Sequence, residues 1–331
     1  MDQFQGRIAV VTGGGTGMGR ELCLALVKAG AHVATCDVIE ENLAETKKLC
    51  AEVAAADLRF TTHRCDVSNE ADVLAFRDEV AEQHETDHIN LLFNNAGIGG
   101  GGDFVEGDRD EWERTFGVCW YGVYYCSRAF MPLLVASEEG YLVNTSSVNG
   151  FGANIGPGVP HTAYSAAKFA VKGFTEAMVT NLRVAAPHVK AAVVMPGHIG
   201  TSIALNTSQV LGKGTALDMS AEEVALVRKR MSDQGMPVDN LPDDDIRTAI
   251  HQRGIEFRDN APTTAAEAAE IILDGVRNDR WRILVGEDAQ RLDRLVREFP
   301  EEAYELSFLQ KLADENVFER MATMGNNQEQ A

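Results

Sequence analysis

The sequence has no apolar run long enough to cross a bilayer, and its first residues, MDQFQGR, lack the basic and apolar segments of a secretory signal. From these absences we expect a cytoplasmic protein with no membrane span. The 6 cysteines include no C-x-x-C pair, and several lie in apolar runs, where a thiol behaves as a small hydrophobic group. We therefore expect reduced thiols, no disulfide framework and no metal site.

Positive charge is also scarce. The chain has 30 Lys and Arg against 50 Asp and Glu, which gives a net charge of −20. This charge disfavours nucleic acid and anionic membranes as partners, and a small neutral or apolar substrate fits it better. The need for solubility explains the acidity equally well.

The 331 residues suffice for one large core, and they alternate short apolar runs with helical stretches. This order predicts an α/β fold, a doubly wound parallel sheet of the Rossmann type with helices on both faces. The predicted strands are 7–14, 31–38, 59–67, 89–97, 141–147, 189–197 and 280–286. The predicted helices are 18–30, 41–56, 70–84, 110–134, 161–183 and 264–278.

After Ile203 the alternation loosens. Residues 205–262 carry helix-like pieces separated by Gly, Pro and Asp, and we interpret them as an inserted substrate lid. Residues 288–324 read as a charged, helical C-terminal extension, and the tail GNNQEQA as disordered. No repeat or low-complexity linker divides the chain, so we interpret 1–331 as a single domain.

A glycine-rich turn, TGGGTGMG, stands between the first strand and the first helix. Thr12, Gly13, Gly17 and Gly19 give the spacing T-G-x-x-x-G-x-G. Glycines let a backbone approach a diphosphate, and a helix N-terminus offers free N–H groups and the positive end of its dipole. In this position the turn predicts a dinucleotide site rather than a simple tight turn.

Asp37 ends the second predicted strand. A carboxylate there accepts hydrogen bonds from the adenosine ribose hydroxyls and repels a 2′-phosphate, so the sequence favours NAD over NADP. No Arg or Lys stands at 14–16 or 38 to reverse that preference. Alternatively, Asp37 only caps the next helix.

Tyr164 and Lys168, in YSAAK, lie one turn apart on the same face of a predicted helix. Spacing alone fits a surface pair as well as a chemical one.

Together these motifs resemble the short-chain dehydrogenase/reductase family over about residues 5–203. The resemblance includes Asp66 and Val67 after the third strand, NNAG at 94–97, NTSS ending at Ser147, YSAAK, and PGHIGT at 196–201. It implies that Ser147, Tyr164 and Lys168 are catalytic. The cofactor contacts that it implies are Thr12, Gly13, Gly17, Met18, Gly19, Asp37, Asp66, Val67, Asn95, Ala96, Gly97, Tyr164, Lys168, Pro196, Gly197, Ile199 and Thr201.

The chemistry of the pair also follows from the side chains. A free tyrosine has a pKa of about 10, and a nearby ammonium stabilises its phenolate and lowers that pKa. Tyr164 then takes the proton of a substrate alcohol while hydride leaves for NAD, and Ser147 holds the substrate oxygen. Ser146 competes with Ser147, but the family pattern S-x-x-G favours Ser147. The resemblance implies that Lys168 also binds the nicotinamide ribose.

One position departs from the family pattern. The resemblance predicts an asparagine seven residues after Trp112 and three before Gly122, and Cys119 stands there. In the family this asparagine helps to hold a water that links the lysine to solvent. Cysteine keeps the backbone carbonyl and loses the amide donors, so we expect an altered proton relay and a competent catalytic triad. Nothing nearby in sequence supports Cys119 as a nucleophile.

The loops beyond the carboxyl ends of the strands supply the candidate substrate contacts, and each of these side chains could instead only pack its loop. They are Phe104, Phe151, Ile155, Val159, His161, His198 and Ile203. Their character suggests a medium-sized, mostly apolar secondary alcohol or ketone, such as an aryl, terpenoid, steroid-like or lignin-derived compound. The resemblance implies a homodimer or homotetramer. The alternatives are an NADP-linked carbonyl reductase and a catalytically silent dinucleotide-binding regulator.

Overall fold

The computed structural model describes residues 1, 3–153, 161–233, 235–315 and 317. Its central sheet has seven parallel strands in the order β3-β2-β1-β4-β5-β6-β9, which confirms the predicted doubly wound sheet. These strands are β1 Ile8–Thr12, β2 His32–Asp37, β3 Phe60–Arg64, β4 Leu91–Asn94, β5 Gly140–Thr145, β6 Val189–Pro196 and β9 Arg282–Val285. The order reverses between β1 and β4, and such a reversal opens a crevice at the carboxyl ends of these strands.

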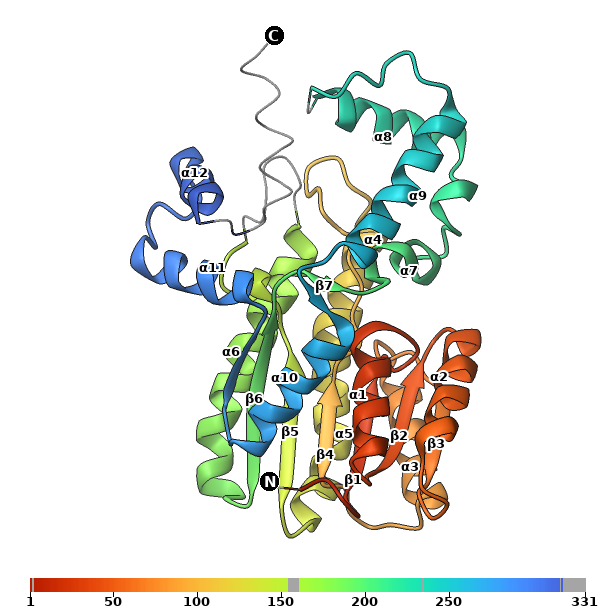
Figure 1. The fold of residues 1–331 in the computed structure, drawn as a ribbon, viewed down its shortest axis with the longest axis vertical. Coiled ribbons are helices and arrows are strands. Elements are labelled where there is room, and N and C mark those ends of the chain that lie inside the picture. The colour runs from red at the N-terminus through yellow and green to blue at the C-terminus, as the bar shows by residue number, and fades with distance from the viewer. Residues whose placement is uncertain (2, 154–160, 234, 316, 318–331) are drawn as a thin grey trace.

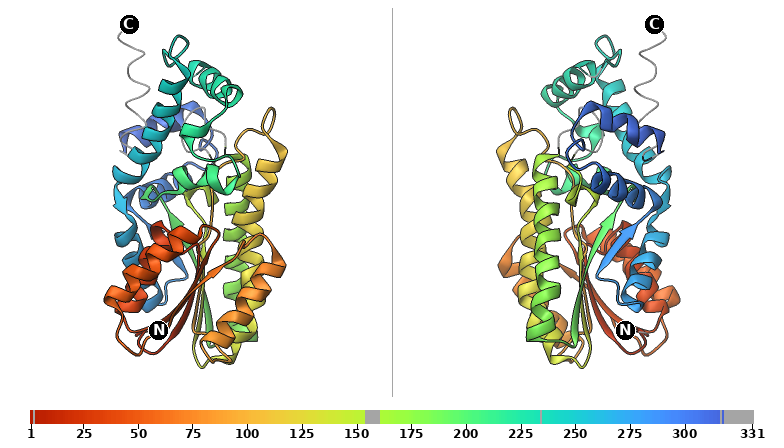
Figure 2. Two further views of the ribbon diagram at one scale, coloured as in Figure 1. Left: turned by 90° about the vertical axis from the view of Figure 1, so that its right-hand side faces the viewer. Right: turned by 90° about the vertical axis from the view of Figure 1, so that its left-hand side faces the viewer.

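Helices cover both faces of the sheet, as Figures 1 and 2 show. One layer contains α1 Gly17–Lys28, α2 Glu40–Val53 and α10 Ala265–Arg277. The other contains α3 Glu70–Gln83, α4 Arg109–Phe116, α5 Gly122–Ala136 and α6 Thr162–Ala185. β1 is buried along its whole length: Ala9 and Val11 join the core under the first layer, and Val10 joins the core under the second. Burial on both faces explains why the strands read as continuous apolar runs.

The predicted helix 110–134 is not one regular helix. A π-helical turn, Gly117–Tyr121, separates α4 from α5. A π-turn adds one residue to the spiral without changing the apolar character of the segment, so hydrophobic periodicity does not reveal it. This turn carries Cys119, and turns of this kind are frequent at functional sites.

The predicted insertion, 205–262, starts within α7, which spans Ile203–Val210. It continues through α8 Ala221–Asp233 and α9 Asp243–Asp259, which share a small core of Val224, Met231, Val238 and Ile246. Two-residue strands, β7 Ile199–Gly200 and β8 Thr263–Thr264, pair in parallel at its root. Figure 1 shows α8 and α9 standing beyond the carboxyl ends of the sheet strands.

The C-terminal extension folds back onto its own chain. It contains α11 Glu287–Glu298 and α12 Leu306–Asp314, and their apolar faces share a cluster with Val148. The tail GNNQEQA lies outside the described residues.

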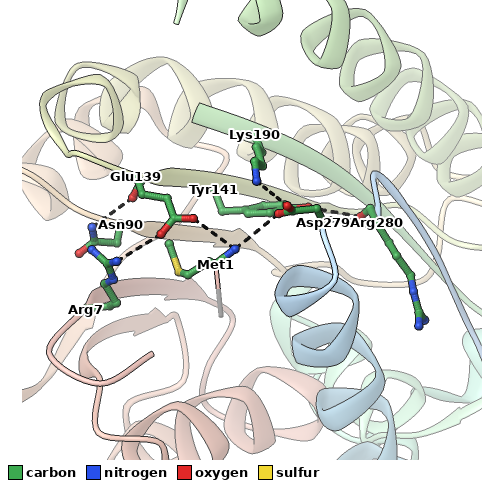
Figure 3. Close-up of polar contacts among 8 residues, drawn as sticks. All are labelled: Met1, Arg7, Asn90, Glu139, Tyr141, Lys190, Asp279 and Arg280. Atoms are coloured by element: carbon green, nitrogen blue, oxygen red, sulfur yellow. Dashed lines mark hydrogen bonds and ion pairs between the residues drawn. The ribbon is translucent and has the colours of Figure 1, made fainter. Parts of the chain in front are cut away.

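The opposite end of the sheet is closed by polar contacts, which Figure 3 shows. The amino group of Met1 lies 3.2 Å from a carboxylate oxygen of Glu139 and 3.5 Å from one of Asp279. Lys190 at the start of β6 also pairs with Asp279, at 2.6 Å. These contacts join segments that are far apart in sequence, and all of them lie at the amino ends of the strands, away from the crevice at the carboxyl ends.

Among the described residues, no helix is long and apolar enough to span a membrane, and no group of three or more His, Cys, Asp or Glu could hold a metal ion.

Candidate active site

Thr12 joins the glycine-rich turn to the end of β4. Its hydroxyl accepts hydrogen bonds from the backbone N–H groups of Asn95 (3.0 Å) and Ala96 (3.1 Å). Gly13 has a φ of +68°, and a Cβ on it would lie 2.7 Å from the Cα of Ala96. A Cβ on Gly19 would lie 2.0 Å from the carbonyl oxygen of Gly13. The two loops therefore meet closely only because these positions are glycine.

A cleft opens between these loops at the N-terminus of α1. Ten of the predicted cofactor residues line it: Gly13, Gly17, Met18, Asp37, Asp66, Val67, Asn95, Ala96, Gly97 and Thr201. Thr12 and Gly19 shape its wall through the contacts above. Pro196, Gly197 and Ile199 lie at the end of β6 and in the strand that follows.

Asp37 faces this cleft from the end of β2. Its carboxylate accepts hydrogen bonds from the N–H groups of Gly15 (3.0 Å) and Ile39 (3.1 Å). Burial raises the pKa of Asp37 above its ordinary value, although both hydrogen bonds act in the opposite direction. Ile39 is the residue that caps α2, so the capping interpretation also holds in part.

Asp66 forms an ion pair with Arg114, with 2.7 Å between the guanidinium nitrogen and the carboxylate oxygen. Burial raises the pKa of Asp66, but hydrogen bonds from Ser68 and Arg114 outweigh it and leave the pKa below the ordinary value. Arg114 also lines the cleft, and sequence reasoning missed it. It lies on α4 in no recognisable motif, so nothing in the sequence pointed to its pairing across the cleft.

Ser147 and Tyr164 are neighbours. Ser147 is buried after β5, and its hydroxyl acts to lower the pKa of Tyr164. Ser146 takes a different role, because its hydroxyl donates to the backbone carbonyl of Lys168 at 2.7 Å. This bond fixes α6 against β5 and leaves Ser147 as the hydroxyl beside the tyrosine.

Lys168 is buried one turn along α6. Its ammonium lies 5.4 Å from the centre of the Tyr164 ring and donates to the carbonyl of Thr145 at 2.9 Å. A Cβ added at Gly97, which lines the cleft, would lie 3.5 Å from this ammonium nitrogen. The Tyr–Lys pair therefore adjoins the cleft and is not a surface pair.

In the protein without cofactor, the pKa of Tyr164 is not lowered as expected from the nearby Lys168. Burial raises the pKa of Tyr164, and the hydrogen bond from Ser147 offsets only part of that effect. Burial also lowers the pKa of Lys168. Desolvation penalises both charged forms, and burial of this kind cannot be read from residue spacing.

Buried amides hold the elements of this site together. The Asn94 side chain on β4 donates to the side chains of Asn144 on β5 (2.8 Å) and Ser127 on α5 (2.9 Å). Asn144 in turn donates to the hydroxyl of Thr175 on α6 at 2.9 Å. Charge-neutral networks of this kind fix the relative positions of their elements when they are buried.

The chain is similar to many known proteins. The family model for short chain dehydrogenase matches residues 7–211. The chain belongs to the short-chain dehydrogenase family. It is therefore an oxidoreductase that acts on CH–OH groups.

Three relatives of this short-chain dehydrogenase illustrate the match. The oxidoreductase SadH of Mycobacterium tuberculosis is 34% identical over 297 residues, which cover 90% of this chain and 92% of SadH. A short-chain dehydrogenase/reductase from Burkholderia phymatum, solved in complex with NAD, is 29% identical with a TM-score of 0.72, over 91% of this chain and 96% of that one. A metagenomic short-chain oxidoreductase, solved with NADP, is 29% identical with a TM-score of 0.51, over 58% and 83%. Members of the family thus bind NAD or NADP.

Cys119 lies near Gly97, beside the cleft of this short-chain dehydrogenase. Its thiol is buried and donates to the carbonyl of Ile98 at 3.2 Å. A Cβ on Gly97 would lie 3.7 Å from the sulfur, so the thiol occupies the region between Lys168 and the cleft. The thiol is thus a hydrogen-bond donor to the loop after β4.

The predicted substrate contacts lie in several places. Ile203 lines the dinucleotide cleft, and Phe151 packs against the C-terminal helices. The His161 ring lies 6.5 Å from that of Tyr164, centre to centre, and burial lowers the pKa of His161. Phe104 is 75% exposed. Ile155 and Val159 lie outside the described residues.

Helix α7 supplies a contact that sequence reasoning missed. The Asn206 side chain donates to the hydroxyl of Thr16 in the glycine-rich turn at 3.2 Å. The Thr207 hydroxyl accepts from the N–H of Gly99 at 2.9 Å. Helix α7 therefore bridges the two loops that flank the cleft, and its position in a weakly patterned segment hid it.

Proposed function

We propose that this chain is an NAD-dependent oxidoreductase that interconverts a medium-sized, mostly apolar secondary alcohol and its ketone. Ser147, Tyr164 and Lys168 carry the proton chemistry, and the cleft between the glycine-rich turn and the end of β4 holds the dinucleotide. The single observation that carries the proposal is the junction at Gly97. Gly97 lines the cleft, and a Cβ added to it would lie only 3.5 Å from the ammonium nitrogen of Lys168. The ammonium therefore lies directly behind the cleft wall.

The cleft fits a dinucleotide on two further counts. Gly13 and Gly19 let the glycine-rich turn pack closely on itself and on Ala96 at the N-terminus of α1, which is the kind of turn that a diphosphate binds. The side-chain oxygen of Asn95, a cleft-lining residue, is buried without a hydrogen-bond partner among the described residues. An unpaired buried polar atom at a cleft wall is favourable only when a ligand or water completes it.

Asp37 supports NAD over NADP. It faces the cleft from the end of β2, where a carboxylate bonds the two ribose hydroxyls and repels a 2′-phosphate. The Burkholderia phymatum relative, which matches over 91% of this chain, was solved with NAD. An NADP-linked carbonyl reductase is the second candidate, because the metagenomic relative was solved with NADP.

The chemistry divides among the three side chains. A bound oxidised nicotinamide would accept the hydride, and its positive charge favours the ionised form of a nearby phenol. Ser147 donates a hydrogen bond to the substrate oxygen and orients it toward Tyr164. Tyr164 accepts the alcohol proton during oxidation and returns it during reduction. Lys168, fixed by the Thr145 carbonyl, stabilises the phenolate and binds the ribose hydroxyls.

The insertion 205–262 acts in this proposal as a substrate lid, since α7 already bridges the two cleft loops through Asn206 and Thr207. The substrate class rests on the apolar residues that the sequence places in the loops beyond the carboxyl ends of the strands. A mouse relative named for an apolar alcohol, epidermal retinol dehydrogenase 2, is 34% identical over 60% of this chain. The aromatic side chains of Trp120, Tyr121 and Tyr124 around the start of α5 suit the subunit contact of a homodimer or homotetramer.

A panel of apolar secondary alcohols, assayed with NAD and with NADP for the appearance of reduced nicotinamide, tests the proposal. We expect turnover of at least one aryl or alicyclic secondary alcohol, with NAD preferred. Turnover only with NADP would replace this proposal by the second candidate. Dinucleotide binding without turnover of any alcohol or ketone on the panel would favour a catalytically silent regulator.

A further inference from the structure

The segment Gly197–Gly200 joins β6 to the inserted helices, and it is held from two sides by parts of the chain that follow the family match at 7–211. In the proposed function this segment belongs to the loop that holds the nicotinamide end of the cofactor. The contacts that fix its backbone therefore bear on the reaction geometry.

Asp288 holds the segment from the side of the C-terminal extension. One carboxylate oxygen accepts a hydrogen bond from the backbone N–H of His198 at 2.7 Å, and the other accepts from the N–H of Ala289 at 2.9 Å. Asp288 is only 7% exposed, and it lies in the first turn of α11, where the helix dipole favours a negative charge. A short hydrogen bond to a buried carboxylate is among the stronger types of hydrogen bond.

Two glycines make room for this carboxylate. A Cβ on Gly197 would lie 2.2 Å from one oxygen of Asp288, and a Cβ on Gly286 would lie 2.4 Å from the other. Gly286 also has a φ of +98°, which side chains rarely tolerate. The carboxylate is therefore enclosed between the end of β6 and the end of β9, where only glycine fits.

The last turn of α9 holds the segment from the other side. The His198 ring nitrogen Nε2 donates to the carbonyl of Phe257 at 2.8 Å, and the two rings lie 4.2 Å apart, centre to centre. A Cβ on Gly200 would lie 2.6 Å from the carbonyl oxygen of Arg258. His198 thus hydrogen-bonds to the C-terminal extension through its backbone N–H and to the insertion through its ring.

We propose that Asp288 is a positioning residue for the nicotinamide end of the cofactor cleft. Its carboxylate fixes the backbone at Gly197 and His198, and the His198 ring transmits that position to the insertion. The adenosine end, built from the glycine-rich turn and Asp37, does not depend on this contact. The inference rests on the proposed function for the identity of the ligand that the segment holds.

The test compares two ligands on the full-length protein. The reduced cofactor that the wild type binds (NADH, or NADPH) reports on both ends of the cleft. ADP-ribose, or its 2′-phosphate for an NADPH binder, reports on the adenosine end alone. For Asp288→Ala we expect the dissociation constant of the reduced cofactor to rise about tenfold or more, and that of ADP-ribose to stay within about twofold. Asp288→Asn, which keeps one acceptor oxygen, is expected to lie between Asp288→Ala and the wild type.

The matched control is Glu287→Ala. This variant removes a carboxylate from the same turn, but the Glu287 side chain is 83% exposed and pairs at the surface with Arg291 on its own helix. It should bind both ligands as the wild type does. Equal weakening of both ligands by Asp288→Ala and Asp288→Asn would mean general destabilisation and would overturn the inference, as would unchanged binding of both. If the wild type binds these ligands but turns over no alcohol, the proposed function fails while the binding comparison still decides this inference.

Discussion

Replacing Tyr164 with phenylalanine removes one hydroxyl group from the proposed reaction and little else. In the free protein this hydroxyl interacts with Ser147, and even a well-formed neutral hydrogen bond contributes only about 1 kcal/mol to stability. A positioned acid–base group contributes about 10²–10⁴-fold to rate, which is about 3–5 kcal/mol of transition-state stabilisation. The two magnitudes differ enough to separate a chemical role from a structural one. We therefore expect kcat to fall at least about a hundredfold, with a small change in melting temperature.

The assay measures reduced nicotinamide formation across pH, beside the affinity for the cofactor. Because burial raises the pKa of Tyr164, wild-type kcat/KM for alcohol oxidation should rise with pH as the phenol ionises, and the phenylalanine variant should lack that rise. Tyr141→Phe is the matched control, since its hydroxyl contacts the Arg280 carbonyl at the closed end of the sheet. A Tyr164→Phe enzyme with more than about a tenth of wild-type kcat would refute the proton-transfer role.

Three further outcomes follow from other contacts. Asp37→Ala should weaken NADH binding about tenfold and strengthen NADPH binding, measured by fluorescence titration. Because burial raises the pKa of Asp37, the wild-type preference for NAD should also shrink as pH falls. A preference that does not change with pH would contradict this. Cys119→Ala leaves the Ile98 carbonyl without its donor and should lower the free energy of unfolding in urea by about 1–2 kcal/mol. Cys119→Ser keeps a donor and should lower it less. Equal losses in the two variants would argue against the hydrogen bond. Burial lowers the pKa of His84 from 6.5 to about 4, so the free energy of unfolding should fall by up to about 3 kcal/mol as pH drops through that window. His84→Asn should reduce this pH dependence. Parallel profiles of unfolding free energy against pH for the two proteins would contradict the burial argument.

The sequence was most informative where one local rule decides the structure. The strand runs, the glycine-rich turn and the Tyr164 helix each depend on local periodicity or on glycine, and the structure has β1, α1 and α6 within a few residues of the prediction. The parallel sheet followed from the alternation of strands and helices. Which side chains line the cleft was predicted from family motifs, and ten of those residues do so.

The remainder depends on contacts between distant segments. Arg114 pairs with Asp66, 48 positions earlier in the sequence, and no hydrophobic periodicity reveals such a pair. The bonds of Asn206 to Thr16 and of His198 to Asp288 join the insertion and the extension to the cleft in the same way. The raised pKa of Tyr164 is a desolvation effect, and only the burial of α6 reveals it. The π-turn at Cys119 changes backbone winding without changing the hydrophobic pattern.

The pairing of β7 with β8 has a consequence for how this enzyme could diversify. Gly200 and Thr264 are paired there, and more than sixty residues lie between them in the sequence. The two ends of this intervening segment are therefore only one strand spacing apart, about 5 Å. Lengthening a loop whose ends are already joined adds little entropic cost. Evolution, or an engineer, could therefore exchange the intervening module for one of another size and leave β6 and β9 in place, provided that the narrow two-strand neck survives.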